Sequence, residues 1–163
     1  MEERPGIADR DHLEGSIRLD DMLDEARSGL QRVPVEALEA MVESGALLVD
    51  IRTSEQRERD GLLPGAEVID LTVLEWRLAP TSPHRIVDLE TDRPVILVCS
   101  EGYSSSLAAA RLQRLGLVNA TDLIGGHKAW RSLTRDGALA RDTQTPETPT
   151  QGDLLQTPIP AED

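Results

Sequence analysis

The chain has 163 residues, of which 39% are hydrophobic and only 2% aromatic, and it contains no phenylalanine. This supports one domain of ordinary size with a core of small aliphatic side chains. The net charge of −13 disfavours non-specific binding of nucleic acid. The chain contains no apolar run of membrane-spanning length and no charged-then-apolar leader. We therefore expect a cytoplasmic monomer that contacts no membrane.

The negative charge is concentrated at the two ends of the chain. Residues 1–32 and residues 138–163 each carry a net charge of −4, so the ends hold most of the total. We expect a flexible N-terminus over 1–15 and an amphipathic helix over 16–32 that packs on the domain or on a partner. Residues 33–137 form the expected domain, and 138–163 form a disordered acidic tail rich in proline and threonine.

Strand and helix patterns alternate through the middle of the chain. Apolar runs predict strands over 46–51, 68–71, 95–99 and 121–124. Helical patterns begin near residues 33, 53, 74, 104 and 126. Three prolines indicate that residues 79–94 form a surface loop. This alternation predicts an α/β fold with a mainly parallel sheet and helices on both faces.

The strand at 95–99 ends at Cys99, the only cysteine of the chain, and Gly102 then turns the chain into a helix that begins with serines. A thiol at a helix N-terminus meets free backbone N–H groups and the positive end of the helix dipole. Both favour the thiolate, which predicts that Cys99 is a nucleophile. The alternative is a small buried hydrophobic residue without chemistry.

The other residues that bind metals or form disulfides give no signal. A single cysteine excludes an intramolecular disulfide. None of the three histidines, His12, His84 and His127, has a cysteine or a second histidine at ligand spacing. We expect no metal site and no cofactor.

Three stretches in this order resemble the rhodanese-like sulfurtransferase domains, over residues 33–133. Residues 48–52 (LVDIR) and 61–66 (GLLPGA) resemble the family's early signature, Val-Asp-x-Arg before Gly-His-Ile-Pro-Gly-Ala, with leucine replacing the histidine. Residues 98–105 (VCSEGYSS) resemble its active-site loop. Residues 125–130 (GGHKAW) match its closing Gly-Gly-x-x-Ala-Trp element.

The resemblance implies a five-stranded, mainly parallel sheet and a sulfurtransferase in which Cys99 carries sulfur as a persulfide. The implied partners are a small sulfur donor and a thiol or cyanide acceptor, with an acceptor protein as a further option. The implied substrate-binding loop consists of Ser100, Glu101, Gly102, Tyr103, Ser104 and Ser105. Asp50 and Arg52, at the end of a neighbouring strand, are expected to support the loop as an ion pair.

The loop departs from the pattern of thiosulfate-using members, which carry Arg or Lys late in this loop. Here Ser104 and Ser105 are neutral and Glu101 is acidic, so we expect weak activity with thiosulfate unless Arg52 or Arg77 turns inward. Phosphatases and arsenate reductases of this fold need an arginine six residues after the cysteine. Position 105 is serine, which disfavours that chemistry.

Two other functions stay open at this point. The chain could be a non-catalytic rhodanese-like binding module, or a redox sensor that needs an external thiol because it has no second cysteine. We interpret Trp76 and Trp130 as core residues, and His127 as the start of a helix rather than a catalyst.

Overall fold

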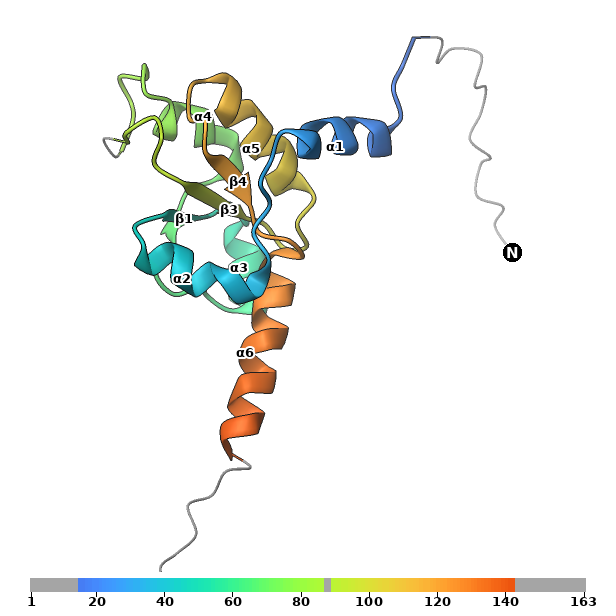
Figure 1. Ribbon diagram of the computed structural model, residues 1–163, viewed down its shortest axis with the longest axis vertical. Coiled ribbons are helices and arrows are strands. Elements are labelled where there is room, and N and C mark those ends of the chain that lie inside the picture. Colours follow the sequence, from blue (N-terminus) through green and yellow to red (C-terminus); the bar gives the residue numbers. More distant parts are fainter. Residues whose placement is uncertain (1–14, 87–88, 143–163) are drawn as a thin grey trace, which may run out of the picture.

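The computed structural model describes residues 15–86 and 89–142, with side chains as far as residue 135. Its centre is a parallel sheet with strand order β2-β1-β3-β4 (Figure 1). The strands are β1 (Leu47–Asp50), β2 (Glu67–Val68), β3 (Val95–Val98) and β4 (Ala120–Asp122). The predicted α/β fold with a parallel sheet is confirmed.

The predicted number of strands is wrong, because the described residues contain four strands and not five. The fifth pairing is reduced to one bridge between Val33 and Leu123. The Val33 N–H donates to the Asp122 carbonyl at 2.9 Å, and the Ile124 N–H donates to the Val33 carbonyl at 2.9 Å. Val35 would donate the next bond of a parallel ladder, but the chain turns into a helix at Val35, so the pairing ends after one residue.

Helices cover both faces of the sheet (Figure 1). The α-helices are α1 (Leu19–Ser28), α2 (Leu38–Glu43), α3 (Ser54–Asp60), α4 (Leu74–Leu78), α5 (Ser104–Arg114) and α6 (Gly126–Asp142), with 3-10 turns η2 (Val35–Ala37) and η3 (Leu71–Val73). One core cluster joins the sheet to α4 and α5, and the other joins it to α2 and to Trp130 of α6. Every side chain of β3 is buried, as its continuous apolar run predicts.

Several element boundaries differ from the predictions. The strand predicted over 68–71 is instead β2 at Glu67–Val68, and the chain turns into η3 at Leu71. Helix α6 continues to Asp142, into the range expected to be a tail, and 1–14 and 143–163 lie outside the described residues. The core placement of Trp76 is wrong: its side chain is 58% exposed on the short helix α4, which buries Leu74 and Leu78 instead.

The helix predicted near the N-terminus forms as α1 and packs on α5. Leu23 is buried, whereas Ile17 and Leu19 at the start of the segment are exposed. The expected domain bounds, 33–137, stay a prediction. No helix in the described part of the chain is both long and apolar enough to cross a membrane.

Candidate active site

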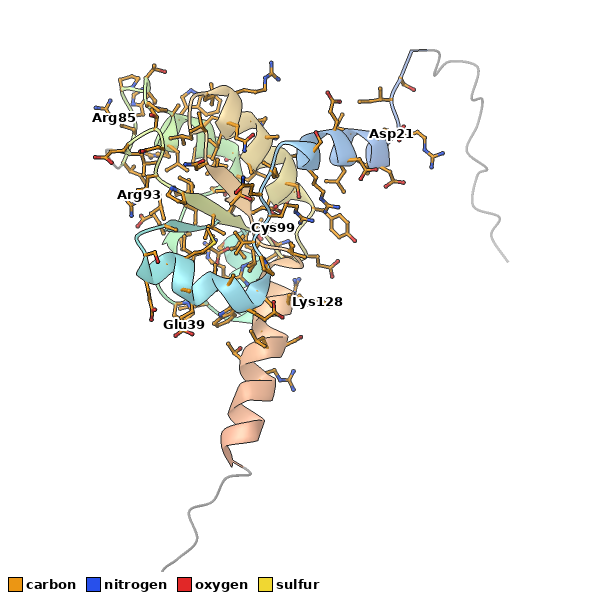
Figure 2. All side chains as sticks on the ribbon, in the orientation of Figure 1. Asp21, Glu39, Arg85, Arg93, Cys99 and Lys128 are labelled. Carbon is orange, nitrogen blue, oxygen red and sulfur yellow. The ribbon has the colours of Figure 1, made fainter. Side chains whose placement is uncertain are left out.

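Cys99 lies directly after β3, at the carboxyl edge of the parallel sheet, where sites form in open α/β folds (Figure 2). Its side chain is buried. The backbone N–H of Gly102 donates to the Cys99 Sγ at 3.1 Å. The Ser105 Oγ, in the first turn of α5, lies 3.1 Å from the same sulfur and accepts from the thiol. The sulfur is therefore held by the loop that follows it.

The surroundings of Cys99 favour its ionised form. Burial raises the pKa of the Cys99 thiol, but hydrogen bonds with the Ser105 and Ser104 side chains and with the Ser105 and Gly102 amides outweigh it. The pKa of the thiol therefore lies below its ordinary value. A lowered thiol pKa is typical of reactive cysteines.

The Gly125-Gly126 motif holds the loop from the other side. The Gly126 backbone has a φ of +61°, and a Cβ there would lie only 2.5 Å from the Cys99 carbonyl oxygen. The first turn of α6 binds the loop, since the His127 N–H donates to the Cys99 carbonyl at 2.8 Å and the Lys128 N–H to the Ser100 carbonyl at 3.0 Å. Only glycine permits this close approach.

A cavity of about 570 Å³ opens in front of the thiol. Cys99, Ser100, Glu101, Tyr103 and Ser104 line it, so the structure brings most of the predicted loop residues to one surface. Gly102 and Ser105 lie behind this surface and are buried.

The charge of the cavity wall is negative. Asp70 and Glu101 both contribute to the wall, and none of the described lining residues is Lys or Arg. Hydrogen bonds from Thr72 lower the pKa of Asp70, so this carboxyl is ionised at neutral pH. The Glu101 carboxylate pairs with Lys128 Nζ at 3.1 Å, and this exposed ion pair partly offsets its charge.

Asp50 and Arg52 form a fully buried ion pair beside the site and not in the cavity. The Arg52 Nη2 donates to the Asp50 Oδ2 at 2.6 Å, and its Nε donates to the Asp50 Oδ1 at 2.9 Å. The same Nη2 also donates to the Gly61 carbonyl at 2.9 Å. The pair therefore ties the end of β1 to the end of α3, and the Arg52 guanidinium does not turn toward the thiol.

His127 is buried in the second position of α6, with its ring centroid 5.3 Å from that of Trp130. Burial and the nearby Arg52 charge lower the pKa of His127, so the ring is neutral at pH 7. Its main-chain bond to Cys99 fits the predicted role as a helix-start residue. Trp130 is half-buried against the core.

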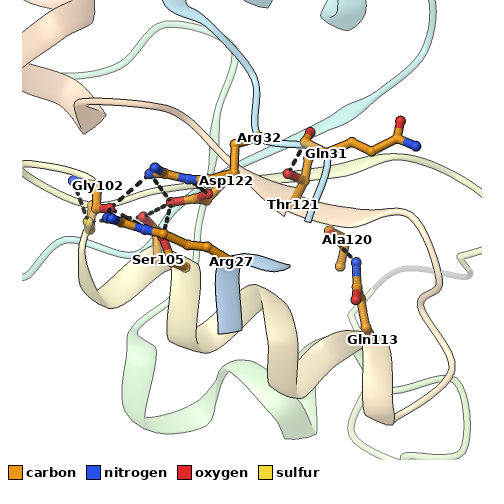
Figure 3. Close-up of polar contacts among 11 residues, drawn as sticks. Arg27, Gln31, Arg32, Gly102, Ser105, Gln113, Ala120, Thr121 and Asp122 are labelled. Carbon is orange, nitrogen blue, oxygen red and sulfur yellow. Dashed lines mark hydrogen bonds and ion pairs between the residues drawn. The ribbon is translucent and has the colours of Figure 1, made fainter. Parts of the chain in front are cut away.

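Three residues of the site were missed by sequence reasoning: Asp122, Arg27 and Arg32. Asp122 is fully buried and accepts from the Ser105 hydroxyl at 2.8 Å and from the Arg32 Nε at 2.8 Å (Figure 3). The only signal for Asp122 was a carboxylate inside a short buried strand. Nothing in the sequence singles out the two arginines.

No group of three or more metal-binding side chains gathers among the described residues. The site that the structure assembles is thus a thiol in a ring of hydrogen-bonding groups, next to an acidic cavity.

A family model for the rhodanese-like domain matches residues 34–133. The chain belongs to the rhodanese-like domain family.

The relatives within the rhodanese-like family include curated sulfurtransferases. The thiosulfate sulfurtransferase GlpE of Pseudomonas fluorescens strain SBW25 is 35% identical over 106 residues, which cover 64% of this chain and 88% of the relative. The GlpE protein of Stutzerimonas stutzeri is 34% identical, covering 62% and 84%. The chain is therefore a rhodanese-like protein related to sulfurtransferases.

Solved structures share the fold. A Rhodopseudomonas palustris protein of unknown function, described as a possible tyrosine phosphatase, superposes with a TM-score of 0.66 and 32% identity, covering 73% of this chain and 92% of that protein. The human single-domain sulfurtransferase TSTD1 superposes with a TM-score of 0.54 and 23% identity, covering 62% and 95%. At that identity, the human protein supports the fold alone.

Iodoacetamide is expected to alkylate Cys99 at neutral pH faster than it alkylates cysteine in a short peptide. Because the pKa of the thiol is lowered, the reactive thiolate forms at lower pH. The alkylation rate should therefore reach half of its maximum at a pH below the midpoint of a free thiol, which is roughly 8.5. The measurement is the alkylation rate against pH, followed by intact mass. A midpoint at the free-thiol value, or protection until denaturant is added, would show a structural cysteine.

Proposed function

We propose that this protein is a sulfurtransferase that moves a sulfane sulfur through a Cys99 persulfide to a thiophilic acceptor. The observation that carries the proposal is the Cys99 Sγ at the cavity wall, with the Gly102 amide and the Ser105 hydroxyl each at 3.1 Å. The family relationship to curated sulfurtransferases supports it. The acceptor is a small thiol or cyanide, with an acceptor protein as the other option.

The chemistry consists of two displacements at sulfur. The Cys99 thiolate attacks the outer sulfur of the donor, the S–S bond of the donor breaks, and the leaving group departs with the electron pair. The acceptor nucleophile then attacks the outer sulfur of the persulfide, and the Cys99 thiolate leaves. The two steps balance without an outside oxidant or reductant. Convergent N–H and O–H groups around Cys99 stabilise the negative charge at each stage.

The acidic cavity argues for a donor with little negative charge. Thiosulfate is a dianion, and it would meet the carboxylates of Asp70 and Glu101 with no cation among the described lining residues. Arg77 lines a different cavity, and the Arg52 guanidinium is bound by Asp50. We therefore propose an organic persulfide as a better donor than thiosulfate.

Transfer from an organic persulfide to cyanide, measured as thiocyanate, tests the proposed function. We expect turnover by the full chain with this donor and slower turnover with thiosulfate. Absence of thiocyanate with every sulfane donor would contradict the proposal.

Ser104→Arg is expected to raise kcat/KM for thiosulfate about 10- to 100-fold, because a guanidinium at the cavity wall pairs with the incoming sulfonate, worth roughly 1.5–3 kcal/mol. Activity with an organic persulfide donor, which has no sulfonate group for the guanidinium to pair with, should change far less. Ser44→Arg, which adds the same charge at an exposed residue after α2, is the control. Brisk thiosulfate turnover by the wild type, with no gain in the variant, would contradict the donor preference.

A non-catalytic binding module is the second candidate. The observation that favours it is a pair of exposed apolar side chains at the N-terminal end of α1: Ile17, just before the helix, is 59% exposed, and Leu19, its first residue, is 71% exposed. A binding module needs no reactive thiol. Slow alkylation of Cys99 with the pH midpoint of a free thiol, together with no sulfur transfer, would favour this function.

Phosphatase activity is disfavoured even though the Rhodopseudomonas palustris relative is described as a possible tyrosine phosphatase. Position 105, where an arginine would clamp the phosphate, is a buried serine bound to Asp122. The guanidiniums of Arg27 and Arg32 bind the Gly102 carbonyl and not the cavity wall. Turnover of p-nitrophenyl phosphate that is lost in Cys99→Ser would overturn this conclusion.

A further inference from the structure

Two guanidiniums bind the outside of the active-site loop at a single carbonyl group. The Arg27 Nη2 donates to the Gly102 carbonyl at 2.8 Å, and the Arg32 Nη2 donates to the same oxygen at 3.0 Å. The N–H of Gly102 donates in turn to the Cys99 Sγ. One residue therefore faces the thiol with its amide and two cations with its carbonyl (Figure 3).

The two arginines come from outside the domain that the family model covers, which begins at residue 34. Arg27 lies in the last turn of α1, and Arg32 lies in the connection between α1 and η2. Packing of α1 on α5 brings Arg27 to the loop, where its guanidinium also lies 5.5 Å from the Tyr103 ring centroid. The segment before the domain thus reaches the site.

Asp122 connects the same cations to the thiol. Its carboxylate binds Arg32 in a bidentate ion pair, at 2.8 and 3.1 Å, and accepts from the Ser106 hydroxyl at 2.9 Å. It also accepts a hydrogen bond from the Ser105 hydroxyl, whose oxygen lies beside the Cys99 sulfur. A chain of hydrogen bonds therefore runs from the thiol through Ser105 to a buried carboxylate.

We propose that Arg27, Arg32 and Asp122, here called the loop clamp, are positioning residues of the sulfur-transfer site that set the charge and the hydrogen bonds met by the Cys99 thiol. This inference rests on the proposed function. The clamp residues touch the loop and not the substrate, so they act through Gly102 and Ser105.

The members of the clamp act on the thiol with opposite signs. The cations on the Gly102 carbonyl favour the thiolate. Asp122 disfavours it, both by its own charge and because Ser105 has one proton, which it cannot give to Asp122 and to the thiolate at once. When the Ser105 hydroxyl turns toward the sulfur, Asp122 still accepts hydrogen bonds from Arg32 and Ser106. The clamp therefore allows both the thiol and the thiolate of Cys99.

The charged groups around Cys99 include more than the clamp. The loop carries Glu101 with its partner Lys128, and the cavity wall carries Asp70. The neighbouring strand β1 ends in the Asp50–Arg52 pair. None of these groups changes in the variants below, so they contribute the same background to each titration.

The test is the pH dependence of Cys99 alkylation by iodoacetamide in the full chain. Arg27→Gln should raise the midpoint by about one unit, as expected for loss of a cation a few ångströms beyond the loop. Arg27→Lys keeps the charge and should stay near the wild type. Arg18→Gln is the matched control, because it removes the same charge from the N-terminal end of α1, where the side chain is 80% exposed.

Asp122→Asn should shift the midpoint in the opposite direction, to lower pH, while its amide oxygen still accepts from Ser106. A purely structural role would move Arg27→Gln and Asp122→Asn the same way, toward the value of a free thiol, because both would loosen the loop. Urea unfolding of each variant identifies any that fail to fold. If Asp122→Asn fails to fold, Arg32→Gln combined with Asp122→Asn removes both charges of the ion pair. Arg27→Lys then separates the two roles, because it keeps the charge but loses the guanidinium contacts, so a shift as large as that of Arg27→Gln would overturn the electrostatic role.

Equal alkylation midpoints for Arg27→Gln and Arg18→Gln would overturn the proposed role of the loop clamp. Midpoint shifts of the same sign in Arg27→Gln and Asp122→Asn would also overturn it. Alkylation requires no sulfur donor. Failure of the clamp is therefore distinguishable from failure of the proposed sulfur transfer, which is measured with a sulfur donor.

Discussion

Cys99→Ser is expected to abolish sulfur transfer, with thiocyanate formation falling to the uncatalysed background. A serine hydroxyl stays protonated at neutral pH and cannot carry a sulfane sulfur as a persulfide. The fold should survive, because the smaller oxygen can still accept from the Gly102 N–H that now binds the Cys99 Sγ. The measurement is the rate of thiocyanate formation with an organic persulfide donor.

The matched measurement for this variant is its urea unfolding curve, which should superpose closely on that of the wild type. Cys99 is the only cysteine of the chain, so no second thiol can take over. Turnover that persists in a folded Cys99→Ser variant would mean that the reaction uses another group, and the proposed persulfide route would fail.

Arg52→Leu is expected to lower the free energy of unfolding by about 3–5 kcal/mol, because it leaves the Asp50 carboxylate buried without its cation. Both side chains of the pair are about 1% exposed or less. The leucine also loses the bond to the Gly61 carbonyl that ties β1 to α3. Urea unfolding gives the free energy, with the slope compared between variants.

Two further variants make the stability result specific. Arg111→Leu breaks the half-exposed ion pair with Glu75 and should change the free energy of unfolding by less than about 1 kcal/mol. The double variant Asp50→Leu/Arg52→Leu should recover part of the loss, because no unpaired charge stays buried. Equal effects of Arg52→Leu and Arg111→Leu would show that the buried pair has no special role.

The parts of the fold that follow from local patterns could be predicted from sequence. The apolar runs of β1 and β3 require burial on both faces, and the helix after β3 shows the spacing of a buried stripe. The position of Cys99 at the end of β3 follows from the same pattern. The loop before α5 was therefore predictable as a unit.

The parts that depend on tertiary contacts could not be predicted in this way. Asp122 lies 90 residues along the chain from Arg32, and their ion pair exists only because β4 and the chain before η2 meet beside α5. The exposure of Trp76 depends on which side of α4 faces the core. The fifth strand is missing because the chain turns into η2 at Val35, directly after the single bridge at Val33, and this bridge forms only once the sheet is assembled.

The most direct test of sulfur transfer through Cys99 is the intact mass of the full chain after incubation with an organic persulfide donor and removal of excess donor. We expect a gain of one sulfur atom in the wild type, lost again when cyanide is added, and no gain in Cys99→Ser. An unchanged mass in the wild type, or a gain that survives in Cys99→Ser, would contradict it.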